Sequence, residues 1–219
     1  MGQISRRLFG LSLDEVRYDV RGFRGGDDPS VRAHVEKVGE RFLDGFHAAL
    51  EQDDDERLID ALEGIEHAFR GFAYEGAAMS LYLLDRMVPW RRRFDALLAS
   101  DEGSRHVYMA YVGAGWAMAR LPFGLRSGLA SMPPLMRWLA LDGYGFHQAF
   151  FDWPRTVEGP RRIPARIRGY GRRAFDQGVG RSLWFVDGHD VDRITRTIAG
   201  FPADRRPDLW SGVGLASIY

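Results

Sequence analysis

Glycines inside long apolar segments constrain the fold of this chain more than any other feature of its sequence. Three segments place a glycine-bearing stretch between a large apolar residue and a small or aromatic continuation: EHAFRGFAYEGAAM (66–79), WLALDGYGFHQAFF (138–151) and PDLWSGVGLASIY (207–219). Glycine in a helix costs about 0.5–1 kcal/mol relative to alanine. Its repeated use therefore predicts a structural purpose, which is the close approach of two helix backbones.

The glycines also recur at a nearly constant interval. The first set of anchors is Gly71, Gly143 and Gly212, and a second set is Gly45, Gly115 and Gly188. The intervals are 72 and 69 residues in the first set and 70 and 73 in the second. Self-similarity at a fixed period is typical of stacked modules. A second register remains open, because Gly45 also aligns with Gly145 at an interval of 100 residues.

These patterns predict a mainly α protein of helical pseudo-repeats of roughly 70 residues, packed into a single domain over residues 1–219. We expect an N-terminal arm at 1–30 and repeats at about 31–100, 101–170 and 171–219. The last repeat is incomplete, which predicts that further residues follow Tyr219 in the natural protein.

Apolar residues at helical spacing between residues 31 and 50 predict an amphipathic helix, with Ser30 as its N-cap. Further helical runs are expected at 57–69, 77–88 (ending at Pro89), 106–121, 136–153, 174–190 and 191–201. Glycines and prolines predict a loop at 121–135. The stretches 16–23 and 181–186 are compatible with short strands.

Composition excludes several classes of protein and site. The chain has 30 basic and 30 acidic residues and no cysteine, which excludes disulfides and cysteine-based metal sites. The balanced charge lacks the basic excess typical of nucleic-acid binding, and no apolar run approaches a membrane span. We expect a cytoplasmic protein. Lys37 is the single lysine and asparagine is absent, which indicates a GC-rich bacterial genome.

Four candidate catalytic residues lie within apolar helical runs. Tyr74 and Glu75 share one run, and Asp142 and His147 share another. A carboxylate in such a setting either pairs with a cation or acquires a raised pKa and can act as a general acid or base. Arg70, Arg120 and Arg181 are the candidate partners of Glu75. Asp142 and His147 diverge by about 140° on a helix, so each requires a partner from another segment.

The segment DGHD (187–190) is a second candidate for chemistry. If it is helical, Asp187 and Asp190 share a face, and His189 adds a nitrogen ligand or base. A divalent metal could then bind Asp187, His189 and Asp190, with a further ligand from elsewhere. The alternative is a helix start whose acidic residues interact favourably with the helix dipole.

Glycine-rich VGAGWA and DGYGF lack the third glycine and the βαβ context of a dinucleotide site, so no nucleotide cofactor is expected.

The large aromatic residues Trp116, Tyr144, Trp184 and Trp210 lie in or beside the glycine segments. Core packing is one interpretation of them. The other is a pocket for a long apolar or conjugated ligand.

Long motifs of the chain resemble a bacterial family known as domain of unknown function 1702 (DUF1702). These motifs are RGFAYEGAAMSLYLLD, YVGAGWAMARL, LALDGYGFHQAFF, RRAFDQGVGRSLWF and DLWSGVGLA. Members of the family occur in actinobacterial natural-product clusters, notably the cassette around enediyne polyketide synthases. The resemblance implies an accessory protein that acts on or binds a linear polyene intermediate during core maturation.

Two functions follow from this resemblance. The first is an enzyme that uses the acidic and histidine residues above on an apolar polyene or polyketide. The second is a non-catalytic helical scaffold that shields the polyene or assembles other proteins of the same gene cluster. The resemblance assigns no catalytic residue.

Overall fold

A computed structural model describes residues 11–88, 90–159 and 162–218, and the described residues contain helices and no strand. Residues 1–10 of the expected arm, Pro89 and Tyr219 lie outside this range. The elements are η1 (Leu13–Val16), α2 (Tyr18–Arg21), α3 (Pro29–Glu51), α4 (Asp55–Glu63), α5 (His67–Met87), α6 (Arg93–Ala99), α7 (Asp101–Arg105), α8 (Val107–Arg120), α9 (Leu125–Ala130), α10 (Met136–Phe151), η2 (Pro154–Glu158), α11 (Tyr170–Val186), α12 (Val191–Ala199) and α13 (Arg206–Ala216). The predicted mainly α fold is confirmed.

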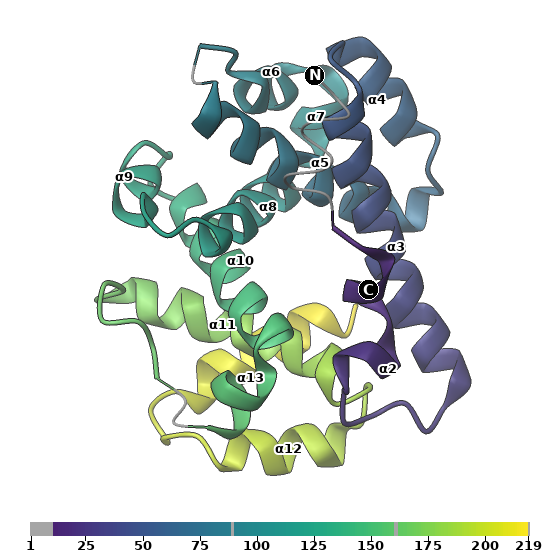
Figure 1. Cartoon of the computed structure of the whole chain (residues 1–219). Helices are drawn as coiled ribbons and strands as arrows, with labels where there is room; N and C mark the ends of the chain where they lie inside the picture. The colour runs from purple at the N-terminus through teal and green to yellow at the C-terminus, as the bar shows by residue number, and fades with distance from the viewer. Residues whose placement is uncertain (1–10, 89, 160–161, 219) are drawn as a thin grey trace.

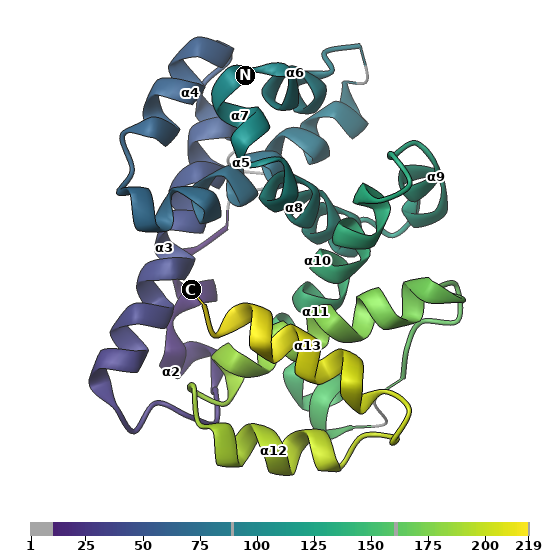
Figure 2. The same ribbon diagram turned by 180° about the vertical axis from the view of Figure 1, so that it is seen from behind.

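The long helices pack in chain order, each against the next. Helix α3 packs on α5, α5 on α8, α8 on α10, α10 on α11 and α11 on α13 (Figures 1 and 2). The segment that precedes α3 contacts the end of α11, where the Arg24 amide donates to the carbonyl of Val186 at 2.9 Å. The rings of His34 on α3 and His189 in that turn lie 6.1 Å apart. The helices thus surround a common centre.

Close backbone contacts at glycines hold successive helices together. A Cβ atom on Gly143 of α10 would overlap the carbonyl oxygen of Val112 on α8. A Cβ atom on Gly115 of α8 would likewise overlap the carbonyl oxygen of Ala140 on α10. Only glycine permits this approach. The expectation that glycines bring helix backbones together is therefore confirmed at these crossings.

Four of the long helices, α8, α10, α11 and α13, each carry a Gly-x-Gly pair. The pairs are Gly113 and Gly115, Gly143 and Gly145, Gly178 and Gly180, and Gly212 and Gly214. Their first members lie 30, 35 and 34 residues apart. In the first three pairs, one glycine faces the preceding helix and the other faces the following helix. A Cβ on Gly214 would meet no atom within 4 Å. The 70-residue pseudo-repeat itself stays a prediction.

Two of the proposed anchors have other roles. A Cβ on Gly71 would meet only side-chain atoms, the nearest being Cγ of Met109 at 3.6 Å. Gly188 lies in the turn after α11 with φ +61°, against the backbone of Gly25. The prediction of a helix–helix crossing was therefore wrong at these two positions.

Several local predictions were also wrong. Residues 16–23 hold the single helical turn α2, and 181–186 lie inside α11, where nearly every side chain is buried. A short apolar run that is buried on several sides has no alternation to separate strand from helix. Asp28, not Ser30, caps α3 by accepting the Ser30 amide, and α9 interrupts the predicted loop.

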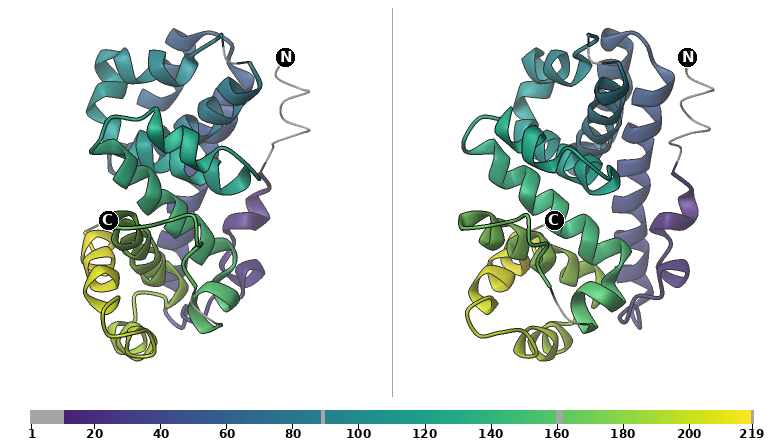
Figure 3. Two further views of the ribbon diagram at one scale, coloured as in Figure 1. Left: turned by 90° about the vertical axis from the view of Figure 1, so that its left-hand side faces the viewer. Right: turned by 60° about the vertical axis from the view of Figure 1, so that its left-hand side comes forward.

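The segment Leu11–Arg21 lies along α3 (Figure 3). Val16 occupies the space beside Gly39 of α3, where an added Cβ would lie 2.6 Å from the Val16 Cβ. Among the described helices, none combines the length and hydropathy that a bilayer crossing demands.

Candidate functional site

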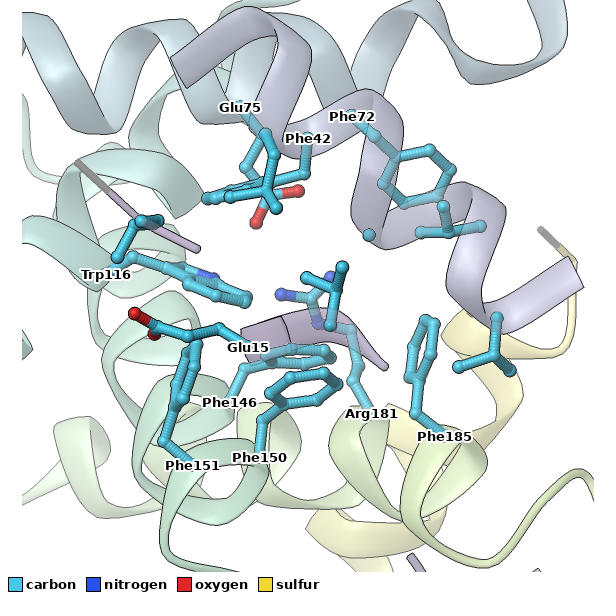
Figure 4. Close-up of a pocket in the computed structure, with 16 residues that line it drawn as sticks. Glu15, Phe42, Phe72, Glu75, Trp116, Phe146, Phe150, Phe151, Arg181 and Phe185 are labelled. Atoms are coloured by element: carbon cyan, nitrogen blue, oxygen red, sulfur yellow. The ribbon is translucent and has the colours of Figure 1, made fainter. Parts of the chain in front are cut away.

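A small apolar pocket of about 40 Å³ lies at the centre of the helices (Figure 4). Its walls come from α3, α5, α8, α10, α11 and the N-terminal segment. Seven aromatic side chains line it: Phe42, Phe72, Trp116, Phe146, Phe150, Phe151 and Phe185. The pocket is therefore built for contact with apolar and π-electron groups.

The indole of Trp116 is the centre of this aromatic group. Its ring centroid lies 4.7 Å from that of Phe42 and 5.1 Å from that of Phe146, on which it stacks. Phe151 meets it edge to face at 5.6 Å. Trp116 follows Gly115, so the close crossing of α8 and α10 positions the indole over the aromatic side chains of α10.

Two buried polar side chains, Glu75 of α5 and Arg181 of α11, point into the pocket from opposite sides (Figure 4). They are 4% and 3% exposed. Burial raises the pKa of Glu75 to about 8, and the charge of Asp142 adds to this effect, whereas Arg181 and the Trp116 indole oppose it. Glu75 is thus mainly a neutral carboxylic acid at pH 7, with a pKa suited to proton transfer.

Arg181 forms an ion pair with Asp142 of α10. Its guanidinium lies 2.6 Å from the carboxylate, and both side chains are buried. The guanidinium also lies 5.0 Å from the ring centroid of Phe146. Burial raises the pKa of Asp142, and Arg181 opposes this effect. The pair places two opposite charges at the pocket wall and adds no net charge there.

His147 lies behind the aromatic wall, on the same helix as Asp142. Its ring is 4.6 Å from that of Phe151 and meets the Trp116 indole edge to face at 5.6 Å. Neither ring nitrogen has a hydrogen-bond partner among the described residues. Burial lowers the pKa of His147 to about 3, and Arg120 and Arg21 contribute to the shift. The imidazole is therefore neutral.

The N-terminal segment closes one side of the pocket with Leu11, Glu15 and Val16. At the pocket, Glu15 pairs with Arg120 at 3.6 Å, and the His47 ring lies 3.0 Å from the carbonyl oxygen of Leu11. This wall is a short segment with one 3-10 turn, whereas the other walls are long helices that cross closely at glycines.

The sequence matches the family described as "Protein of unknown function (DUF1702)" over residues 1–219. The chain belongs to the DUF1702 family. Neither the curated proteins nor the solved structures contain a match to it.

Around its pocket, the DUF1702 chain gathers four residues that the sequence singled out. Glu75 and Trp116 line the pocket, Asp142 pairs with the lining residue Arg181, and His147 contacts the lining ring of Phe151. Glu75 and Asp142 lie on different helices, yet both interact with Arg181.

Two predicted tyrosines lie outside the pocket lining of the DUF1702 chain. The hydroxyl of Tyr74 donates to Glu63 at 2.9 Å, and its ring stacks on His106 with 4.2 Å between centroids. The hydroxyl of Tyr144 accepts a hydrogen bond from Arg166. Both side chains are buried and bonded within the fold.

The residues of DGHD (187–190) form the turn between α11 and α12. The premise that they form one helical face was wrong, because α11 ends at Val186 and α12 begins at Val191. Asp187 pairs with Arg24 at 2.5 Å and accepts from Thr197, whereas Asp190 caps α12 by accepting the Arg193 amide. His189 has φ +61° and stacks on Trp184 at 4.5 Å.

The described residues of the DUF1702 chain contain no group of three or more histidine, aspartate or glutamate side chains that could hold a metal. The alternative for this acidic segment was a helix start, and Asp190 lies at the start of α12 as its N-cap. Trp184 and Trp210 do not line the pocket, and Trp210 is 38% exposed on α13.

Sequence reasoning missed most of the lining. Val35, Val38 and Phe42 appeared only as one apolar face of a helix, and the arm residues Leu11 and Val16 had no distinguishing signal. Their contribution depends on which helices meet at the centre.

Proposed function

We propose that this DUF1702 protein is an accessory protein of bacterial enediyne-type polyketide biosynthesis that acts on or binds a linear polyene intermediate in the central pocket. One observation carries the proposal: an aromatic pocket contains a single buried carboxyl, Glu75, that is neutral at pH 7. The genomic setting comes from the family resemblance, and the choice of ligand comes from the chemistry of the pocket.

The lining favours an uncharged, conjugated chain. The faces and edges of aromatic rings interact well with other π systems, and the ion pair of Asp142 and Arg181 leaves no uncompensated charge beside Glu75. A ligand carboxylate would add a buried charge without a free partner, which is costly. A neutral polyene avoids this cost.

The ligand must open the pocket to enter it. Its volume of about 40 Å³ is well below the cavity of about 150 Å³ that admits benzene in a protein core. Displacement of the segment Leu11–Val16 would open the pocket on one side, since this segment forms one wall. Among the described residues, the polar contacts of Leu11–Val16 to other elements are those of Glu15 and Leu11.

In the first form of the proposal, Glu75 moves a proton to or from the bound chain. A pKa of about 8 lets one carboxyl both hold and accept a proton near neutral pH. In the alternative form, the protein is a scaffold that shields the polyene, and Glu75 only tunes the polarity of the pocket. The aromatic lining supports both forms.

Gene deletion with product profiling tests the proposal. We expect a linear polyene to accumulate in the deletion strain, and genes for the wild type and for Glu40→Gln, an exposed glutamate outside the pocket, to restore the product. Failure of a folded Glu75→Gln protein to restore it supports proton transfer. Restoration by Glu75→Gln but not by the pocket-filling Val38→Trp supports shielding. An unchanged product profile after deletion would refute both forms.

A further inference from the structure

A second concave site lies on the outer side of the molecule, at the opposite end of α10 from the pocket aromatics. It is a groove of about 320 Å³ between α9, the first turns of α10 and the segment that leads to α11. Its floor is apolar and consists of Leu125, Leu129, Ala130, Trp138, Leu141 and Ile167. None of these residues lines the central pocket.

Four arginines surround this apolar floor: Arg126, Arg137, Arg166 and Arg168. No acidic residue lines the groove, and none of the four forms an ion pair with a residue that the structure describes. The chain as a whole has equal numbers of acidic and basic residues. The groove therefore concentrates positive charge in a chain whose total charge is balanced.

The surroundings of two of these guanidinium groups bear on which ligand the groove could bind. The Nε atom of Arg137 is buried and has no hydrogen-bond partner among the described residues. Arg166 donates to the hydroxyl of the buried Tyr144, which anchors it at the groove. Arg166 is therefore held in place at the groove, where an oxyanion would accept hydrogen bonds from its guanidinium.

Charge and shape together define the ligand class. Guanidinium groups bind phosphate and carboxylate oxygens in a fork geometry. Four uncompensated charges favour an anion with at least two negative charges, which a phosphate monoester or diphosphate provides and a carboxylate does not. The floor around Trp138 favours an apolar or aromatic body next to that phosphate. We propose that this groove binds an organic phosphate with an apolar body.

Titration calorimetry of the whole chain with 1-naphthyl phosphate tests the proposal. Arg126 and Arg168 are exposed and donate no side-chain hydrogen bond to a described residue, so their loss leaves the fold intact. The variant is Arg126→Ala/Arg168→Ala. The matched control is Arg105→Ala/Arg196→Ala, which removes the same charge from exposed positions on α7 and α12.

We expect the groove variant to weaken binding of 1-naphthyl phosphate about tenfold or more, because each lost contact is a charge-assisted hydrogen bond. The control should change it less than about twofold, and inorganic phosphate should bind at least about tenfold more weakly than 1-naphthyl phosphate. Equal weakening in both variants, or no advantage of the naphthyl group, would overturn the proposal.

A second arm identifies the source of the phosphate. Phosphatidylcholine vesicles with and without phosphatidic acid are tested for co-sedimentation with the protein. Binding of 1-naphthyl phosphate in solution indicates a free organic phosphate, whereas binding confined to the phosphatidic acid vesicles indicates a lipid headgroup. Either result supports a phosphate site if the groove variant weakens the binding and the control variant does not, and absence of both contradicts the proposal.

Discussion

The carboxylate of Asp142 and the guanidinium of Arg181 approach to 2.6 Å in the core, and neither side chain is more than 3% exposed. Each residue adjoins a glycine at a helix crossing, Gly143 and Gly180 respectively. Gly143 faces α8 and Gly180 faces α13, and a Cβ on Gly178 of α11 would overlap the carbonyl oxygen of Asp142 itself. The ion pair therefore lies at the close crossing of α10 and α11. It also faces Glu75, whose pKa depends on both charges.

Arg181→Met should destabilise the fold by about 3–5 kcal/mol, because removal of one partner leaves Asp142 as an unpaired buried charge. The double variant Asp142→Leu/Arg181→Met should recover most of this loss. Urea unfolding measures the free energy of unfolding of both variants. The control removes the exposed Arg92 from its pair with Asp95, which should change that free energy by less than about 1 kcal/mol. Equal losses in the single and double variants would contradict the account.

Glu75→Gln should make the protein more stable at neutral pH. The folded pKa of about 8 lies above the ordinary value of 4.5, so the unfolded chain ionises first. This group therefore lowers the free energy of unfolding as pH rises from 4.5 to about 8. The advantage of Glu75→Gln over the wild type should grow across that range, to the order of 4 kcal/mol. A constant difference between the two proteins from pH 5 to pH 8 would show that Glu75 is ionised in the fold.

His147→Leu should make the stability of the protein less sensitive to acid. The folded pKa of about 3 lies below the ordinary 6.5, so the unfolded chain takes up a proton that the folded chain does not. Wild-type stability should fall for this reason as pH drops from 6.5 towards 3. The variant also removes two unpaired buried nitrogens, so it should be at least as stable at pH 7. Thermal unfolding of both proteins between pH 4 and pH 7 measures the difference. If the variant is much less stable than the wild type at pH 7, the imidazole has a stabilising partner and the account is wrong.

Gly212→Ala and Gly214→Ala form a matched pair on one helix. A Cβ at Gly212 would overlap the carbonyl oxygen of Gln177, whereas a Cβ at Gly214 meets nothing within 4 Å. We expect Gly212→Ala to cost several kcal/mol, as forced overpacking does, and Gly214→Ala to gain about 0.5–1 kcal/mol from helix propensity. Denaturant midpoints compare the two variants, and similar values would rule out close helix crossings at these glycines.

The sequence predicted the helical class and the purpose of the glycines, because the cost of glycine in a helix requires compensation wherever it recurs. It also pointed to Glu75, Asp142, Trp116 and His147, since polar or large residues beside such glycines are forced into the core. It could not predict that Glu75 and Asp142 share Arg181, or that Leu11 and Val16 complete the pocket. These contacts depend on how helices that are distant in sequence come together, which no local pattern records.

Binding of a neutral conjugated probe tests the central claim most directly. Fluorescence titration with 1,6-diphenylhexatriene should show one saturable site per chain. Val38→Trp, which fills the pocket, should abolish binding, and Val20→Trp, the same change at a position 58% exposed, should leave it unchanged. Val35→Phe serves as a milder pocket-filling variant if Val38→Trp does not fold. Saturable binding that survives in the folded pocket-filling variants would contradict a central site for an unsaturated chain.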